Sequence, residues 1–211
     1  MKLFLFSCFF ALAASIPHSV PPKPRFDVGG MITMIEDFFP ANQTLSFNTT
    51  GMDQAWAQIA SNFSLSVEEN SLQKDRCADI MVVFARGTYE IGNVGVLVGA
   101  PFLQVLRELA APGLTIEMQG VEYAANMTGY QLGGDPEGSQ KMADTILTVQ
   151  NKCPRAKVVV SGYSQGAQLV HNAMKKLKNT TLEGIDAVVT FGDPLYPRIP
   201  EGVPGWKMLS V

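Results

Sequence analysis

The sequence predicts an α/β fold, a doubly wound parallel sheet with helices on both faces. Between residues 77 and 195, short runs of apolar, β-branched residues alternate with segments of helical periodicity. The strand candidates are continuous apolar runs and lack the in–out alternation of a sheet that has one face in water. Parallel strands that are covered on both faces have this pattern. A chain of 211 residues is long enough for one domain with a sizeable core.

Each predicted element follows from its own pattern of residues. The strand candidates lie at residues 79–85, 114–120, 157–162 and 186–192, and the helix candidates lie at residues 93–109, 138–153 and 165–178. Glycines weaken the helix prediction for residues 93–109. Lysines gather in the last turns of residues 165–178, where positive charge suits the helix dipole. Strand and helix therefore alternate through this part of the chain.

Residues 16–75 are expected to form an N-terminal extension ahead of the domain at residues 76–211. The extension begins with a proline-rich stretch, residues 16–26, which predicts extended chain. Apolar residues then recur at helical spacing in residues 28–35 and 53–63, with a polar loop between them. We interpret these two helices as packing on the domain or capping its edge, in preference to a binding role.

Residues 1–15 have the pattern of a secretory signal peptide. Lys2 is followed by the apolar run LFLFSCFFALAAS, which ends in small residues. A membrane anchor is the alternative, but the run is short for a hydrocarbon core of ~30 Å, and prolines follow at once. The sequence therefore predicts a secreted, extracellular protein without a membrane anchor.

The cysteines and the glycosylation sequons fit the same compartment. Cys8 would leave with the signal peptide, and the two cysteines that remain, Cys77 and Cys153, are predicted to pair in a secreted chain. Closing a loop of about 75 residues would stabilise the fold by ~4–5 kcal/mol in the chain-entropy model. Five Asn-x-Ser/Thr sequons predict glycans at Asn42, Asn48, Asn62, Asn126 and Asn179.

The charge of the chain argues against a nucleic-acid partner. The formal net charge is −3, and charged residues make up 17% of the sequence. There is no basic run and no cluster that mixes basic with aromatic residues. Proteins that bind nucleic acid usually carry such a patch, so this function class is not expected.

The pentapeptide GYSQG, residues 162–166, is the candidate nucleophile site. Ser164 lies directly after an apolar strand candidate and directly before a helix candidate. A tight strand-to-helix turn holds a nucleophilic serine exposed, and it needs small residues at the positions of Gly162 and Gly166. The backbone N–H of Gln165, at the start of the helix, can donate to an oxyanion. An ordinary turn is the alternative, and the strand and helix on either side argue against it.

A second oxyanion donor would have to come from another loop. The segment ARGT follows the first strand candidate, and ligands of such sheets bind at the carboxyl ends of the strands. Gly87 allows the backbone to approach closely, and Thr88 offers both an N–H and a hydroxyl. Taken alone, the tripeptide at residues 86–88 is more typical of a turn with a helix cap.

Four features of the chain occur together. They are the segments ARGTYEIGNVG (85–95), MQGVEYA (118–124) and VVVSGYSQGA (158–167), and the pair Cys77 and Cys153. In their combination and separation, they resemble the fungal cutinases and their relatives. These are secreted serine esterases of the α/β-hydrolase class. The resemblance covers about residues 77–195 and implies the same fold for this chain.

The resemblance implies a role for each matching residue. Ser164 corresponds to the nucleophile, Thr88 to the hydroxyl residue of the oxyanion hole, and Gln165 to the backbone donor of that hole. The pair Cys77–Cys153 corresponds to the first disulfide of the family. Tyr89 departs from the pattern, since a serine or threonine is usual at its position.

The resemblance also places the catalytic acid and base after Ser164, in a segment with a second cysteine pair, a Gly-Asp and a later histidine. Residues up to 211 contain no such segment. The triad Asp and His are therefore expected not to be present in this chain, and the sheet to lack its last strand and final helix. His171 lies roughly 10 Å along the helix from Ser164, beyond hydrogen-bond reach, and is interpreted as a surface or packing histidine. Asp193 is interpreted as part of a structural turn, and His18 lies in the proline-rich start.

These observations favour a secreted carboxylic-ester hydrolase of cutinase type, in which Ser164 forms an acyl-enzyme. The resemblance implies a polyester such as cutin as the substrate, and acetylated xylan is the main rival. Such chemistry needs no metal and no organic cofactor. The expected partner is the ester substrate, bound by a monomer. The alternative is a non-catalytic secreted glycoprotein, a pseudoenzyme that uses the fold for binding.

Overall fold

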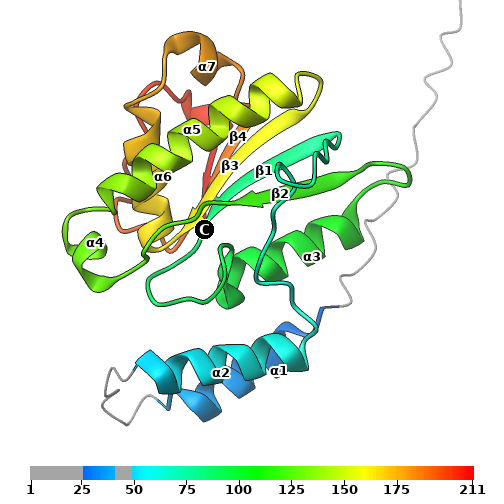
Figure 1. Cartoon of the computed structure of the whole chain (residues 1–211), viewed down its shortest axis with the longest axis vertical. Helices are drawn as coiled ribbons and strands as arrows, with labels where there is room; N and C mark the ends of the chain where they lie inside the picture. The colour runs from blue at the N-terminus through cyan, green and yellow to red at the C-terminus, as the bar shows by residue number, and fades with distance from the viewer. Residues whose placement is uncertain (1–25, 41–48) are drawn as a thin grey trace, which may run out of the picture.

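A parallel sheet forms the centre of the part of the chain that the computed structural model describes, residues 26–40 and 49–211 (Figure 1). Within these residues the sheet has five strands in the order β2-β1-β3-β4-β5, and all neighbouring strands run parallel. The strands are β1 (Ile80–Ala85), β2 (Ile116–Gly120), β3 (Lys157–Tyr163), β4 (Ala187–Phe191) and β5 (Met208–Ser210). The predicted doubly wound α/β fold is confirmed.

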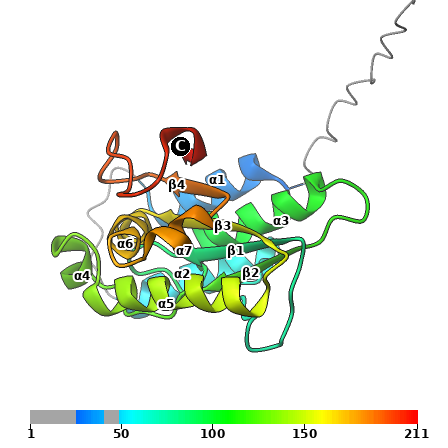
Figure 2. The same ribbon diagram turned by 90° about the horizontal axis from the view of Figure 1, so that it is seen from above.

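Helices cover both faces of this sheet. They are α1 (Val28–Phe38), α2 (Thr49–Asn62), α3 (Ala100–Leu109), α4 (Met127–Gln131), α5 (Pro136–Lys152), α6 (Gln165–Met174) and α7 (Asn179–Glu183). A π-helical turn, η1 (Gly95–Gly99), runs directly into α3, and a 3₁₀ turn, η2 (Gly205–Lys207), precedes β5. Helices α5 and α6 lie on one face and α3 lies on the other, as Figures 1 and 2 show.

The side chains of β1 show why its sequence is a continuous apolar run. Met81 and Val83 belong to the apolar cluster under α5 and α6, whereas Val82 and Phe84 belong to the cluster under α3. All four side chains are completely buried. Alternate residues of a strand point to opposite faces, so a strand that is buried on both faces needs apolar residues at every position.

The predicted strands and longer helices are present, with ends that differ by a few residues. Three short elements were not predicted: α4, α7 and β5. Helices α4 and α7 have five residues each and β5 has three, which is too short for a periodic pattern to be recognised. Strand β5 pairs in parallel with β4, with Val188 opposite Met208, so a fifth strand follows the four expected ones and the expectation that the sheet lacks its last strand is wrong.

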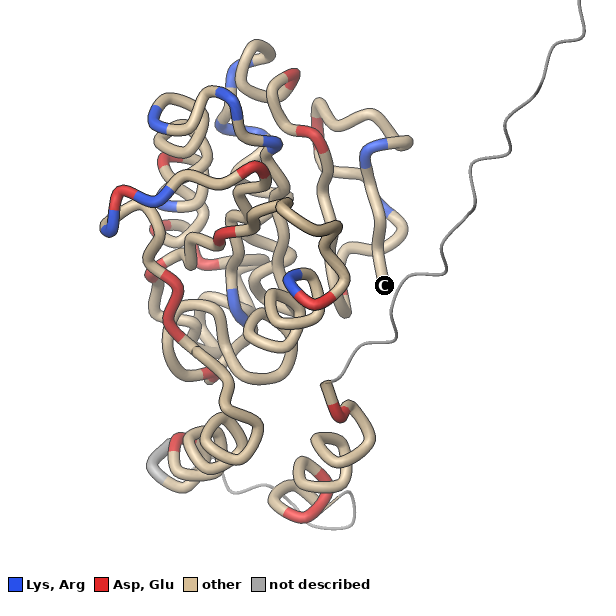
Figure 3. The backbone as a smooth tube through the Cα atoms, turned by 90° about the vertical axis from the view of Figure 1, so that its right-hand side faces the viewer, with Lys and Arg blue, Asp and Glu red and all other residues tan. Residues whose placement is uncertain are grey.

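Helices α1 and α2 pack against the turn that precedes α3. Met31 of α1 and Trp56 and Ile59 of α2 form an apolar cluster with Val96 of η1. This contact agrees with the interpretation that the extension packs on the domain. In the described residues of α1 and α2 the charged side chains are acidic, whereas both signs of charge are spread over the rest of the molecule (Figure 3).

Some expectations lie outside the described residues. They are the signal peptide at residues 1–15 with Cys8, most of the proline-rich start with His18, and the sequons at Asn42 and Asn48. No helix in the described part of the chain has the length and apolar character needed to span a bilayer.

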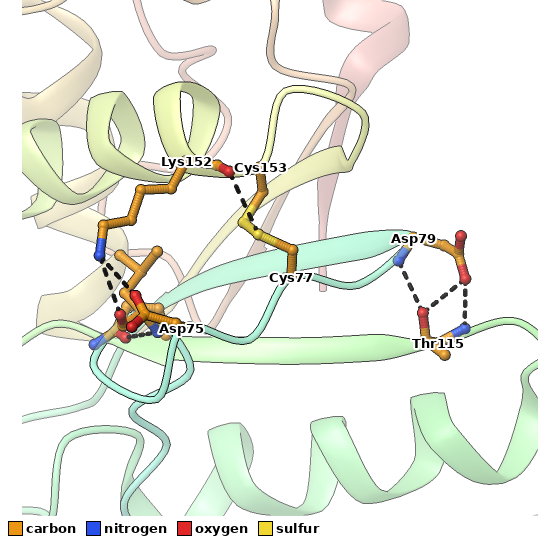
Figure 4. Close-up of a disulfide and its surroundings, with 8 residues drawn as sticks. Asp75, Cys77, Asp79, Thr115, Lys152 and Cys153 are labelled. Carbon is orange, nitrogen blue, oxygen red and sulfur yellow. Dashed lines mark hydrogen bonds and ion pairs between the residues drawn. A yellow bond between two sulfur atoms is a disulfide. The ribbon is translucent and has the colours of Figure 1, made fainter.

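The predicted disulfide between Cys77 and Cys153 is confirmed. It joins the chain just before β1 to the residue that ends α5, across a sequence separation of 76, with the two Cα atoms 5.5 Å apart. An ion pair of 3.1 Å between Lys152 and Asp75 lies beside it (Figure 4). The disulfide therefore ties the start of the sheet to the helix that packs on it.

Removing the disulfide is expected to cost much of the stability of the fold. We predict that replacing both Cys77 and Cys153 by alanine lowers the free energy of unfolding by ~4–5 kcal/mol, because the cross-link restricts the unfolded chain. Urea unfolding followed by circular dichroism measures this. The control is Asp75→Asn, which removes only the exposed ion pair next to the disulfide and should leave the urea midpoint almost unchanged. A double variant that unfolds at the same urea concentration as the parent would contradict the prediction.

Candidate active site

Ser164 occupies a strained turn between β3 and α6. Its backbone angles are φ 53° and ψ −114°, and it precedes the first residue of α6. A non-glycine residue with positive φ costs on the order of 1–3 kcal/mol and persists only where the surrounding structure enforces it. The side chain is half-buried. This is the geometry of a nucleophile elbow, which presents a serine at the carboxyl end of the sheet.

The two glycines around Ser164 are needed because backbone packs against them. A Cβ atom on Gly162 would lie 2.3 Å from the carbonyl oxygen of Gly166. A Cβ atom on Gly166 would lie 2.0 Å from the carbonyl oxygen of Ala85, at the end of β1. Neither distance is possible for a real side chain, so the G-x-S-x-G spacing predicted from sequence has a direct steric cause.

Gln165 begins α6 and is completely buried. The amides in the first turn of a helix have no acceptor within the helix, so the Gln165 N–H is placed to donate to a charge that develops beside Ser164. The side chain also has a function that the sequence analysis did not assign. Its Nε2 donates to Thr88 Oγ1 at 2.8 Å and to the main-chain oxygen of Asn126 at 2.9 Å.

Thr88 therefore lies against the first residue of α6, and its function in an oxyanion hole stays a prediction. The main-chain oxygen of Asn126 can only accept, which fixes the amide nitrogen of Gln165 on the side of Thr88. Because Thr88 Oγ1 accepts a hydrogen bond from Gln165, the proton of its hydroxyl remains available for another acceptor. A substrate oxyanion would be such an acceptor.

The loop that carries Thr88 is fixed by Arg86 and Tyr123. Arg86 Nε donates to the carbonyl of Glu90 at 2.7 Å, and Arg86 Nη2 donates to the carbonyl of Tyr123 at 2.8 Å. In return the hydroxyl of Tyr123 donates to the carbonyl of Arg86 at 2.6 Å. Burial raises the pKa of Tyr123 above its ordinary value, so this hydroxyl keeps its proton. Helix α2 adds a further contact, because Trp56 Nε1 donates to the carbonyl of Tyr89.

His171 is a buried packing residue. Its Nε2 lies 2.9 Å from Asp193 Oδ2, and both side chains are almost completely inaccessible. The other carboxylate oxygen of Asp193 accepts from the Leu195 N–H at 2.8 Å, which confirms the interpretation of this residue as part of a turn. A rise of ~1.5 Å per residue places His171 roughly 10 Å along α6 from Ser164, so it is not positioned as a base.

Three of the five sequon asparagines lie in the described residues. Asn62, Asn126 and Asn179 are exposed, and Asn126 Oδ1 caps α4 by accepting from the Gly129 N–H. Exposure is necessary for a glycan but does not establish one, so glycosylation stays a prediction.

The sequence analysis also left out Glu90, the last residue of the motif Arg-Gly-Thr-x-Glu. Its carboxylate is buried in the loop that carries Thr88, and within the described residues it accepts hydrogen bonds only from main-chain N–H groups. The sequence does contain an indication that Glu90 matters. It is a charged residue only five positions after a buried strand, and a charged group that is buried needs a partner. The partners could not be identified, because they are backbone groups.

Comparison with protein families and known proteins points to one group. Residues 76–207 match the family model described as Cutinase. The chain is 49% identical over 146 residues to cutinase pbc1 of Pyrenopeziza brassicae, covering 69% of this chain and 68% of that protein. It is 46% identical over 130 residues to a cutinase of Botryotinia fuckeliana, covering 62% and 64% respectively. The matched part is thus just under two thirds of the Botryotinia protein.

Two Trichoderma proteins match over a larger part of the chain. Cutinase cut1 of Trichoderma harzianum is 39% identical over 202 residues, which cover 96% of this chain and 79% of that protein. The solved structure of a Trichoderma reesei cutinase in complex with a phosphonate inhibitor superposes with a TM-score of 0.72 at 35% identity. That match covers 87% of this chain and 81% of the solved one.

The close approach at Gly166 gives a test of the elbow. We predict that Gly166→Ala lowers the free energy of unfolding by roughly 3 kcal/mol or more, because the new methyl group forces α6 away from the end of β1. Gly51→Ala in α2 is the matched control. A Cβ there meets nothing within 4 Å, and alanine favours a helix, so this variant should be as stable as the parent or slightly more so. Equal urea midpoints for the two variants would show that the elbow is not packed as described.

Proposed function

The chain belongs to the cutinase family of carboxylic ester hydrolases, and from this premise we propose that Ser164 is its nucleophile. The observation that carries the proposal is the strained positive φ of Ser164 at a strand-to-helix turn. The first amides of α6 and the hydroxyl of Thr88 support it, because they are hydrogen-bond donors next to the turn that holds Ser164.

The proposed reaction has two steps. Ser164 Oγ attacks the ester carbonyl while its proton passes to a base, and the oxyanion is bound by the Gln165 N–H and the Thr88 hydroxyl. The intermediate then expels the alcohol, which takes the proton from the base, and leaves an acyl-enzyme. In the second step water attacks the acyl group with the same base, and the acid and free Ser164 are released.

His171 does not meet the requirements for the base, since Asp193 holds it about two helical turns from Ser164. We therefore propose that no histidine among the described residues acts as the base. The disulfide supports an oxidising, extracellular location for the enzyme.

We propose that the substrate is a polyester such as cutin. The carbonyl of Asn126 contacts Gln165, and the chain that follows Asn126 exposes apolar side chains. Leu132 is 66% exposed and Tyr130 is 37% exposed. Exposed apolar side chains on a loop that contacts the residue after Ser164 suit an aliphatic polymer better than a hydrated polysaccharide.

The catalytic proposal is tested with p-nitrophenyl butyrate. The 211-residue chain should hydrolyse it only at a residual rate, of the kind that an oxyanion hole alone provides, on the order of 10³–10⁴ over water. A second protein, extended after Val211 by the segment that follows the matched region in the Trichoderma harzianum relative, should be faster by at least 10²-fold, if that segment brings the base that the resemblance to the family implies. Ser164→Ala should abolish the faster rate, and Thr88→Val should lower kcat about 10²-fold with little change in KM. A fully active Ser164→Ala variant would refute the nucleophile, and normal rates from the 211-residue chain would refute the proposal that the described residues supply no base.

The substrate proposal has a separate test with the extended protein. We expect release of hydroxy fatty acids from cutin at a rate that depends on Ser164, and little release of acetate from acetylated xylan. Mass spectrometry and an acetate assay measure the two products, with Ser164→Ala as the blank. Faster release of acetate would favour the acetylxylan alternative, and release of neither product would favour a binding protein.

A further inference from the structure

We propose that Glu90 is the positioning residue of the oxyanion loop, and that its buried carboxylate fixes Gly87 and Thr88 to the first turn of the helix formed by η1 and α3. This inference rests on the proposed function, in which Thr88 binds the oxyanion. It concerns the last residue of the motif Arg-Gly-Thr-x-Glu, for which the reaction itself gives no use.

The contacts of the carboxylate carry the proposal. Glu90 Oε2 accepts from the Gly87 N–H at 2.6 Å. Glu90 Oε1 accepts from the N–H groups of Val96 and Leu97 at 2.9 and 2.7 Å. The residue is only 5% exposed. Because all three partners are donors, the site matches an ionised carboxylate, which has acceptors only.

The position of the carboxylate at the start of a helix makes the attachment rigid. Val96 and Leu97 lie in the first turn of η1, which continues into α3, and α3 packs on the sheet through Leu103. The free amides of a helix N-terminus attract negative charge. Glu90 therefore joins a loop of the site to an element that is itself fixed to the core.

The neighbouring glycines leave space for this carboxylate. A Cβ atom on Gly95, which has φ of 75°, would lie 2.5 Å from the carboxyl carbon of Glu90. A Cβ atom on Gly87 would lie 3.0 Å from Glu90 Oε2 and 2.7 Å from the ring of Tyr163. Gly87 and Gly95, two of the three glycines in the segment ARGTYEIGNVG, thus stand where a side chain would crowd the carboxylate of Glu90.

The charge of the carboxylate is balanced locally. Burial raises the pKa of the Glu90 carboxyl, and the three N–H donors and the nearby Arg86 oppose this effect. Arg86 also donates to the carbonyl of Glu90, so side chain and main chain of this residue are both held. Burying a charged group costs free energy, and a simple turn does not require one. The buried carboxylate with its several partners therefore points to a function beyond forming the turn.

Thr88 is consequently held from two directions. Its main chain follows Gly87, whose N–H is fixed by Glu90, and its hydroxyl oxygen is fixed by Gln165 Nε2. Catalysis by an oxyanion hole depends on donors that are in place before the charge develops. Loss of the Glu90 contact would let the loop shift while the sheet and the elbow remain folded.

The test uses Glu90→Gln in the 211-residue chain and in the extended protein. The substitution keeps the shape but replaces one acceptor oxygen by an NH₂ group, which cannot accept from an N–H. Glu137→Gln is the control, because Glu137 is an exposed residue of α5 that pairs only with Lys141 in the described structure. Glu90→Asp, which keeps the charge but withdraws the carboxylate by one methylene, is the second variant in case Glu90→Gln does not fold.

Amide NMR of the 211-residue chain gives a readout that does not depend on activity. We expect the Gly87 proton at low field in the parent, and in Glu90→Gln an upfield shift and at least tenfold faster hydrogen exchange at Gly87 and Thr88. Exchange at Val82 in β1 should be unchanged. In the extended protein, we expect kcat per folded molecule to fall about tenfold and KM to change by less than twofold. This decrease is smaller than the 10²–10³-fold loss of kcat caused by removing an oxyanion-hole donor, because the donor is displaced and not removed.

Unchanged amides at Gly87 and Thr88, or an unchanged kcat in folded Glu90→Gln, would overturn the proposal. Faster exchange throughout β1 would also overturn it, since it would show a loss of global stability in place of a loss of position. A different result would separate the two proposals. If Thr88→Val leaves kcat unchanged while Glu90→Gln speeds exchange of the Gly87 amide, the proposed function of Thr88 in the oxyanion hole is refuted, but the attachment of the loop by Glu90 is supported.

Discussion

The candidate site depends on how closely helix α6 approaches the end of strand β1. A Cβ of Gly166 would lie only 2.0 Å from the carbonyl oxygen of Ala85, and Ala85 is paired in register with Gly162 of β3. The end of β1 and the turn after β3 are therefore packed directly against each other. Thr88 follows β1 and Gln165 follows β3, so the parallel register brings their side chains to a contact of 2.8 Å. A parallel sheet places such exits at one edge, and the glycine contact fixes the spacing.

Polar groups are concentrated at this same edge of an otherwise apolar sheet. Arg86, Glu90 and Gln165 are buried there. Arg86 and Gln165 form hydrogen bonds with the loop that leaves β2, and Glu90 binds backbone groups of its own loop and of η1. In a medium of low polarity, hydrogen bonds between such groups are strong and resist movement, although Arg86 Nη1 and Gln165 Oε1 have no partner among the described residues. That rigidity suits an oxyanion hole, which stabilises charge because its donors do not have to reorganise.

Much of this arrangement could be predicted from the sequence, because it depends on local pattern. Continuous apolar runs predicted the four longer strands, and the spacing of Gly162, Ser164 and Gly166 predicted the turn after β3. The two cysteines that follow the expected signal peptide predicted the disulfide. The short elements α4, α7 and β5 could not be predicted, since their formation depends on the elements that they pack against.

The polar contacts of the site could not be predicted for a different reason. The side chain of Gln165 meets Thr88 only because of the register between β1 and β3, and the partners of Glu90 are backbone amides without a residue signature. The pairing of His171 with Asp193 likewise joins positions 22 residues apart. Sequence periodicity shows which positions are buried, but it does not show which polar groups meet there.

The pairing of His171 with Asp193 completes the restraint of the elbow. The Ser164 N–H donates to the carbonyl of Phe191 at the end of β4, and Asp193, two residues further on, holds His171 about two turns into α6. The end of β4 and the turn after it thus contact α6 both at its start and at His171, and Gly166 packs on the end of β1. A strained residue keeps its conformation only when its surroundings determine it several times over. Here three independent contacts act on one turn, and this explains how Ser164 can keep a positive φ at the start of a helix.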